Sequence, residues 1–190
     1  MSSMPFDPAR PVRRPETVKV WDIALRAFHW SFALCFAGAW LTAESERYRD
    51  VHVIFGYTAL GLVAFRLLWG FVGPKHARFG NFVRGPAAIG RYLRSLLDGR
   101  PEHHTGHNPA GAVAIVLLLG LGALAGLSGW GIYDNWSGEW LEESHEILAG
   151  AMLLVVGVHL AGVAVASWLH RENLARAMVT GRRRVPAVRP

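Results

Sequence analysis

The sequence contains a single cysteine, Cys35, among its 190 residues. One thiol excludes an internal disulfide framework, a Cys-rich zinc site, a protein-ligated iron-sulfur cluster and the C-x-x-C-H attachment of a covalent haem. Histidine, by contrast, occurs nine times. Any transition metal bound by this chain must therefore depend on histidine.

Charged residues are also scarce. They make up 18% of the chain, whereas hydrophobic residues make up 52%, and residues 31–43, 51–65 and 109–133 contain no Asp, Glu, Lys or Arg. Soluble domains carry about 25% charged residues. The composition therefore predicts a membrane protein. The net charge of +6 is what basic loops of such a protein produce, so we expect no nucleic-acid partner.

Four apolar runs are long enough to cross a hydrocarbon core, which takes roughly 20 residues. They cover residues 21–43, 52–72, 109–133 and 145–169. Pro109 stands at the start of the third run, where a helix does not need its missing N–H. We therefore expect an all-α membrane protein in which residues 18–170 form a bundle of four transmembrane helices. Residues 1–17 are expected to be a flexible N-terminal tail and residues 171–190 a basic C-terminal tail.

Basic residues indicate the direction of these spans. Of the 20 Lys and Arg residues, only Arg47 and Arg49 fall on the side away from the termini. The positive-inside rule then places both termini in the cytoplasm. The opposite, periplasmic side carries an excess of acids: Glu44, Glu46, Asp50, Asp134, Glu139, Glu142, Glu143 and Glu146.

Four histidines lie in or at the rim of the spans, and an imidazole there needs a partner because lipid cannot hydrogen-bond it. His145 and His159 are fourteen residues apart, which puts them on one helix face at two depths, roughly 21 Å apart. His29 lies at the depth of His159, and His52 lies at the depth of His145. Two levels with two imidazoles each predict two six-coordinate bis-histidine haems.

Two other interpretations of the histidines stay open. They could be unrelated structural residues, or they could bind another metal. A closed zinc site needs third and fourth protein ligands, however, and only Glu146 at the outer level could add one.

Two arginines lie near the inner level. Arg66 follows His52 by fourteen residues on the same helix face, and Arg26 precedes His29 by about one turn. Cations this deep need an anionic partner, which haem propionates would supply. The alternative is that both side chains extend to the cytoplasmic headgroups.

Several motifs resemble the bacterial cytochrome b561 family, which is related to the b-type cytochrome subunits of nickel-iron hydrogenases. The resemblance covers about residues 18–170. It depends on R-A-F-H-W at 26–30, H-V-I-F-G-Y at 52–57, F-R-L-L-W-G-F-V-G at 65–73, A-R-F at 77–79, G-H-N-P-A-G-A at 106–112 and W-L-E-E-S-H-E at 140–146.

The resemblance implies a membrane cytochrome with two haems b per chain, one ligated by His29 and His159 and the other by His52 and His145. It also implies electron exchange with quinone or quinol in the membrane lipid. The partner on the other side would be a periplasmic cytochrome c or a larger oxidoreductase complex of which the chain is the membrane subunit.

Three functions remain to be separated: an electron carrier without catalytic residues of its own, a self-contained superoxide:quinone oxidoreductase, and a haem-free scaffold. An acidic periplasmic face repels the superoxide anion and attracts a cationic cytochrome c. This favours the electron carrier.

Overall fold

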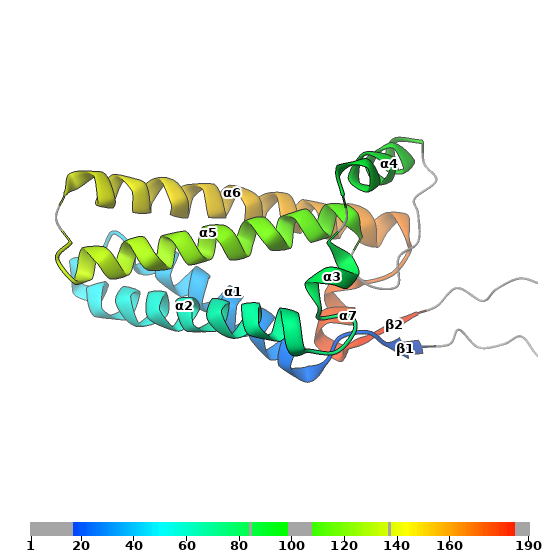
Figure 1. Cartoon of the computed structure of the whole chain (residues 1–190), viewed down its shortest axis with the longest axis horizontal. Helices are drawn as coiled ribbons and strands as arrows, with labels where there is room; N and C mark the ends of the chain where they lie inside the picture. The colour runs from blue at the N-terminus through cyan, green and yellow to red at the C-terminus, as the bar shows by residue number, and fades with distance from the viewer. Residues whose placement is uncertain (1–16, 84, 99–107, 137, 185–190) are drawn as a thin grey trace, which may run out of the picture.

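The computed structural model describes residues 17–83, 85–98, 108–136 and 138–184 of the chain (Figure 1). Helices account for most of the described residues. In chain order the elements are β1 (Thr17–Lys19), α1 (Ile23–Thr42), the 3-10 turn η1 (Glu46–Tyr48), α2 (Arg49–Val72), α3 (Phe79–Phe82), α4 (Pro86–Leu97), α5 (Pro109–Tyr133), α6 (Glu139–Leu169), α7 (Leu174–Thr180) and β2 (Arg182–Arg184).

Helices α1 and α5 begin where a side chain can satisfy free backbone N–H groups. Asp22 precedes α1 and its carboxylate accepts a hydrogen bond from the N–H of Leu25 at 2.9 Å. Asn108 does the same for Gly111 at the start of α5, where Pro109 occupies the first helical position. Such caps stabilise a helix by about 1 kcal/mol. The start predicted at Pro109 is therefore confirmed.

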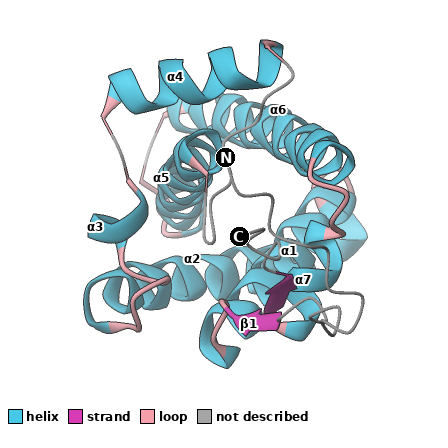
Figure 2. Cartoon of the chain, turned by 90° about the vertical axis from the view of Figure 1, so that its right-hand side faces the viewer, coloured by secondary structure: helices cyan, strands magenta, loops and turns pink. Residues whose placement is uncertain are grey.

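The four long helices run side by side as two antiparallel pairs, α1 with α2 and α5 with α6 (Figure 1). The pairs meet where α2 packs against α5. Figure 2 views the bundle end on, with β1 and α7 in the foreground. We call this end of the bundle, where β1 pairs with β2, the clasp end. The opposite end holds η1 and the turn between α5 and α6, and we call it the loop end.

Glycines allow the long helices to approach one another closely. A Cβ atom added at Gly122 would lie 2.9 Å from the Phe32 ring of α1, and one added at Gly126 would lie 3.0 Å from Leu60 of α2. At Gly38 of α1 an added Cβ would overlap the ring of Phe55. Gly122 and Gly126 of α5 thus let this helix lie close to side chains of α1 and α2.

Three helical segments in the described part of the chain are long and apolar enough to cross a membrane: Glu46–Val72, Pro109–Tyr133 and Glu139–Leu169. Large apolar side chains such as Leu68, Leu154 and Leu160 are exposed on them. Apolar surface of this extent suits a lipid environment. Helix α1 is less hydrophobic than these three and does not qualify as a span by its mean hydropathy. The structure therefore supports three of the four predicted spans.

Two helices differ from the predicted runs at the loop end. Helix α6 begins at Glu139, six residues before His145, and α2 begins at Arg49. The prediction followed apolar residues only, whereas the first turn of α6 contains Glu139 and Glu142 and that of α2 contains Arg49 and Asp50. Acidic side chains are favoured at a helix N-terminus.

Part of the segment predicted as a basic C-terminal tail is folded against the start of α1. Strand β2 pairs antiparallel with β1, with Val18 opposite Arg183, and the carbonyl of Gly181 accepts hydrogen bonds from the N–H groups of Val20 and Trp21. Gly181 has a φ of +77°, a conformation that glycine adopts without steric cost. We call this pairing of β1 with β2 the terminal clasp. Residues 1–16 and 185–190 lie outside the described residues.

Candidate cofactor site

The rings of His52 and His145 face each other at the loop end. His52 lies in the first turn of α2, and His145 lies about two turns into α6. Their ring centroids are 6.1 Å apart, with an angle of 73° between the ring planes. Both side chains are half-buried. The structure thus brings together the two histidines that the sequence places at one depth.

Each of these two rings is held through its Nδ1 atom. His52 Nδ1 lies 2.9 Å from the carbonyl oxygen of Ala39, and His145 Nδ1 lies 3.0 Å from that of Ala125. The hydroxyl of Ser128 donates to the same Ala125 carbonyl and lies 3.0 Å from His145 Nδ1. Because a carbonyl oxygen only accepts, each Nδ1 must carry a proton, which leaves the lone pair of the neutral ring on Nε2.

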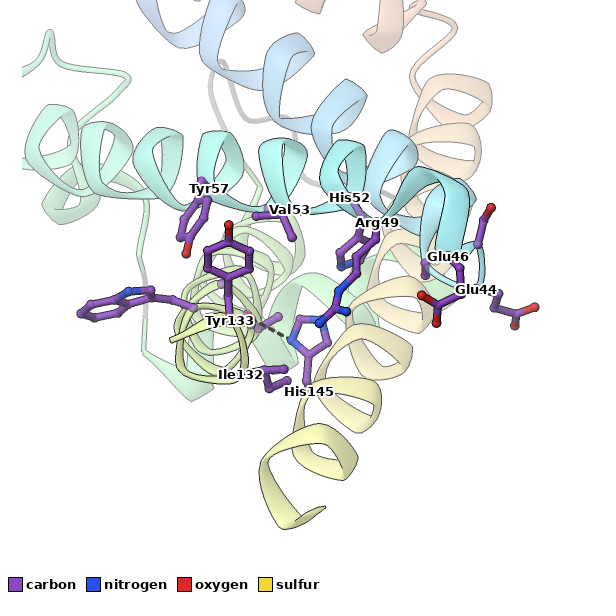
Figure 3. A pocket seen from close by; sticks show the side chains of 16 residues that line it. Glu44, Glu46, Arg49, His52, Val53, Tyr57, Ile132, Tyr133 and His145 are labelled. Carbon is purple, nitrogen blue, oxygen red and sulfur yellow. Dashed lines mark hydrogen bonds between the residues drawn. The ribbon is translucent and has the colours of Figure 1, made fainter. Parts of the chain in front are cut away.

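A cavity of about 380 Å³ lies beside the two rings (Figure 3). Gly129 lines it, and a Cβ atom added there would lie 3.0 Å from Cε1 of His145. The glycine therefore leaves the space that the imidazole occupies. Tyr57 and Tyr133 also line the cavity, with their rings edge to face at 6.0 Å.

The second pair, His29 and His159, comes from α1 and α6, nearer the clasp end. The two side chains are half-buried. His29 Nδ1 is buried and has no hydrogen-bond partner among the described residues. The protein therefore leaves part of the bonding capacity of this ring unused.

The helices that carry His29 and His159 are not in close contact. Among the described long helices, α1 packs on α2, α2 on α5, and α5 on α6, while α1 and α6 do not form a closely packed pair. A large flat group can therefore enter between α1 and α6 without breaking a helix interface.

The donor set fits a haem better than a metal held by protein alone. No group of three or more His, Cys, Asp or Glu side chains able to hold a metal occurs in the described part of the chain. An ion at roughly 2 Å from one nitrogen of each ring fits within the 6.1 Å between the His52 and His145 centroids. Haem iron takes two axial protein ligands and brings its other four with it.

Arg66 is buried, with 1% of its surface exposed. Its Nη2 donates to the carbonyl of Ala77 at 3.0 Å, and its guanidinium lies 4.6 Å from the centroid of the Phe79 ring. Its Nη1 is buried without a hydrogen-bond partner among the described residues. This burial disagrees with the alternative that Arg66 extends to the headgroups.

Arg26 joins α1 to α7, because its guanidinium donates to the carbonyl of Val179. Its Nε atom is buried and unpaired among the described residues. Both Arg26 and Arg66 thus have backbone partners, and their role at haem propionates stays a prediction.

Sequence reasoning missed several residues of the outer site: Ser128, Arg49, Tyr57 and Tyr133. Ser128 carried a usable signal, because it is one of only two hydroxyl side chains in the run 109–133, and a lone polar residue in an apolar span usually bonds to a neighbouring helix. Arg49 also carried a signal, since it is one of only two basic residues predicted on the side away from the termini. Tyr57 and Tyr133 gave none, because tyrosine is common in membrane helices and at their ends.

Comparison with known proteins gives the following matches. A protein-family model described as prokaryotic cytochrome b561 matches residues 20–181. A relative from Rhodobacter capsulatus, named as a probable Ni/Fe-hydrogenase B-type cytochrome subunit, is 22% identical over 90% of this chain and 83% of its own length. A relative of the same name from Azotobacter vinelandii is 26% identical over 94% of this chain and 93% of its own length. No solved structure matches this chain.

Proposed function

This chain belongs to the prokaryotic cytochrome b561 family, and from that premise we propose that it carries electrons across the membrane with two b-type haems. His52 and His145 would hold one haem and His29 and His159 the other. The family and the hydrogenase cytochrome relatives support a membrane-bound b-type cytochrome in electron transfer. The resemblance found in the sequence motifs is thereby confirmed.

One observation carries the proposal. The rings of His52 and His145 lie 6.1 Å apart, and both Nδ1 atoms are bonded to backbone carbonyls. A metal-binding histidine almost always donates its other ring N–H to an oxygen, which fixes the ring and raises its basicity. The hydrogen bonds at Nδ1 thus support the proposal that the Nε2 atoms of His52 and His145 would hold the haem iron.

A bound b-type haem supplies one-electron chemistry by cycling between ferric and ferrous iron. The chain's own residues set the conditions for that chemistry. Helix α6 carries one histidine of each pair, fourteen residues apart, and so keeps the two sites roughly 21 Å apart along the bundle. Apolar side chains of α1, α2, α5 and α6 keep water from the space between them.

We propose four spans with both termini in the cytoplasm of a bacterial inner membrane. Helix α1 would be the fourth span, because it packs along α2 and its residues 31–43 carry no charge. The orientation follows from the basic residues, because 18 of the 20 Lys and Arg residues belong to the sequence segments on the side of the termini. The outer histidine pair then lies near the periplasm and the inner pair nearer the cytoplasm.

The partners in this proposal are quinone or quinol within the membrane and a redox protein outside it. The relatives named as hydrogenase cytochrome subunits favour a larger oxidoreductase complex of which this chain is the membrane subunit. The acidic residues of the loop end favour a partner with a basic surface, such as a cytochrome c.

The test is a reduced-minus-oxidised spectrum of the purified protein together with a pyridine haemochrome count. We expect a b-type spectrum and two haems per chain. His76→Ala serves as the matched control, since His76 lies in the segment after α2 and outside both pairs; it should retain both haems. One haem or none in the wild-type protein would refute the proposal.

A further inference from the structure

Two arginines break the charge pattern of the molecule. Arg47 and Arg49 stand at the loop end, whereas the other Lys and Arg residues that the structure describes lie toward the clasp end. Basic residues are disfavoured on the outer side of a membrane protein. A basic residue on that side can be explained by the contacts that its side chain makes there.

The structure separates the two arginines. The guanidinium of Arg47 lies over the ring of its neighbour Tyr48, 5.8 Å from the ring centroid. Arg49, the first residue of α2, lines the cavity beside His52 and His145. In Figure 3 the side chain of Arg49 extends toward the space between the two imidazoles.

The guanidinium of Arg49 forms no ion pair with the residues that the structure describes. This holds although Glu44 and Glu46 line the same cavity. These carboxylates lie at the rim, as Figure 3 shows, on the side away from Tyr57 and Tyr133. Arg49 is thus a cation that is directed into the cavity and available to an anion bound there.

We infer that Arg49 binds a carboxylate of the group held by His52 and His145, namely a propionate of the outer haem. The inference rests on the proposed function. A b-type haem carries two carboxylates, and Glu44 and Glu46 would repel them from this rim. A guanidinium can bind a carboxylate through two parallel N–H donors, which fixes its position as well as neutralising its charge.

The inference makes Arg49 a positioning residue with an electrostatic effect. Its positive charge stabilises the reduced haem, which has one electron more than the oxidised form. Removing the charge should therefore lower the midpoint potential of the outer haem. We expect the one-electron equilibrium constant to fall by about tenfold, which corresponds to about 59 mV.

The test compares Arg49→Gln, Arg49→Lys and Arg47→Gln by redox titration of the purified proteins, after a haemochrome count on each. The outer haem is identified as the spectral component that His52→Ala removes. Arg49→Gln should lower the potential of this component, or lose this haem alone. Arg49→Lys should keep the haem and restore more than half of the shift, and Arg47→Gln should match the wild type.

Three results would overturn the inference. Arg49→Gln could titrate as the wild type does, or Arg47→Gln could produce an equal shift, which would mean a general surface effect. The wild-type potential could also change with added acetate or phosphate at constant ionic strength, which would mean that Arg49 binds a free anion. A wild-type protein without haem would instead refute the proposed function.

Discussion

The two nitrogens of each outer histidine have separate roles. Nδ1 of His52 bonds to a carbonyl in α1, and Nδ1 of His145 bonds to a carbonyl in α5. Each ring is therefore held by a helix other than its own. Ring orientation then depends on helix packing, so the orientation of both imidazoles is set as the bundle assembles.

The four histidines should be separable by substitution. We expect His159→Ala and His29→Ala each to remove the inner haem and to leave the outer haem largely intact, because the two sites share no ligand. His52→Ala should have the opposite effect. Low-temperature difference spectra, which resolve the two components, would measure this. If His29→Ala removed the component that His145→Ala also removes, the pairing would be wrong.

Arg66 should influence the inner haem if its free Nη1 meets a propionate. We expect Arg66→Leu to lower the midpoint potential of the inner component, because a buried cation is lost. Arg66→Lys should keep most of the potential, since it retains the charge. Redox titration of both variants is the measurement. Equal potentials in wild type and Arg66→Leu would assign Arg66 to its contacts with Ala77 and Phe79 alone.

At the scale of single residues, the sequence could predict which histidines share a depth, because depth follows from helical spacing. The proximity of His52 and His145 agrees with that prediction. The partners of Nδ1 could not be predicted. They are backbone carbonyls, which every residue has, so Ala39 and Ala125 carry no signal in their side chains. The partners of Arg26 and Arg66 could not be predicted either, because they too are backbone carbonyls.

At the scale of elements, the sequence predicted the helices whose signals lie close together in the chain. It did not predict the pairing of strands that lie far apart in the chain. Helix α5 runs over Pro109–Tyr133 as expected, because its cap, its proline and its uncharged run all lie within it. Strands β1 and β2 are three residues long and depend on each other across almost the whole chain. Periodicity within either one is too short to detect.

The end of α2 offers a test of helix packing. A Cβ atom at Gly70 would overlap the ring of Phe79, whereas one at Gly61 of the same helix would meet nothing within 4 Å. We expect Gly70→Ala to destabilise the protein by about 1–3 kcal/mol, the usual cost of overpacking. Thermal unfolding in detergent would measure it. The matched control Gly61→Ala should leave stability unchanged or slightly higher.

If Gly61→Ala lowered the melting temperature as much as Gly70→Ala does, α2 would tolerate alanine at neither position. In that case the contact with Phe79 would not explain the effect. Gly70→Ala should also disturb Arg66, because both contact Phe79.

At the scale of the whole molecule, the proposed orientation can be measured directly. We expect a periplasm-active reporter fused after residue 184 to be inactive, and the same reporter inserted beside Ser45 to be active. An even number of spans with basic segments inside requires this result. An active reporter at the C-terminal position together with an inactive one beside Ser45 would mean that the orientation is reversed. The crossing of α1 is tested by the same reporter fused at the N-terminus, which should be inactive; activity both there and beside Ser45 would leave three spans.

The composition alone indicated a membrane protein, and three helices bear this out. Helix α1 marks the limit of that argument. It contains Arg26 and His29, which lower its mean hydropathy, so a functional residue and a weak membrane signal coincide there. Sequence hydropathy measures transfer into lipid, and it underrates a helix whose polar residues face the bundle interior.

The terminal clasp also sets an order of events during synthesis. Strand β1 is made before all four long helices and β2 after them, and a ribosome adds only about 5–20 residues per second. Thr17 to Lys19 therefore wait, without their partner, until α6 and α7 have been made. The segment before α1 is therefore joined last, when the N–H groups of Val20 and Trp21 meet the carbonyl of Gly181.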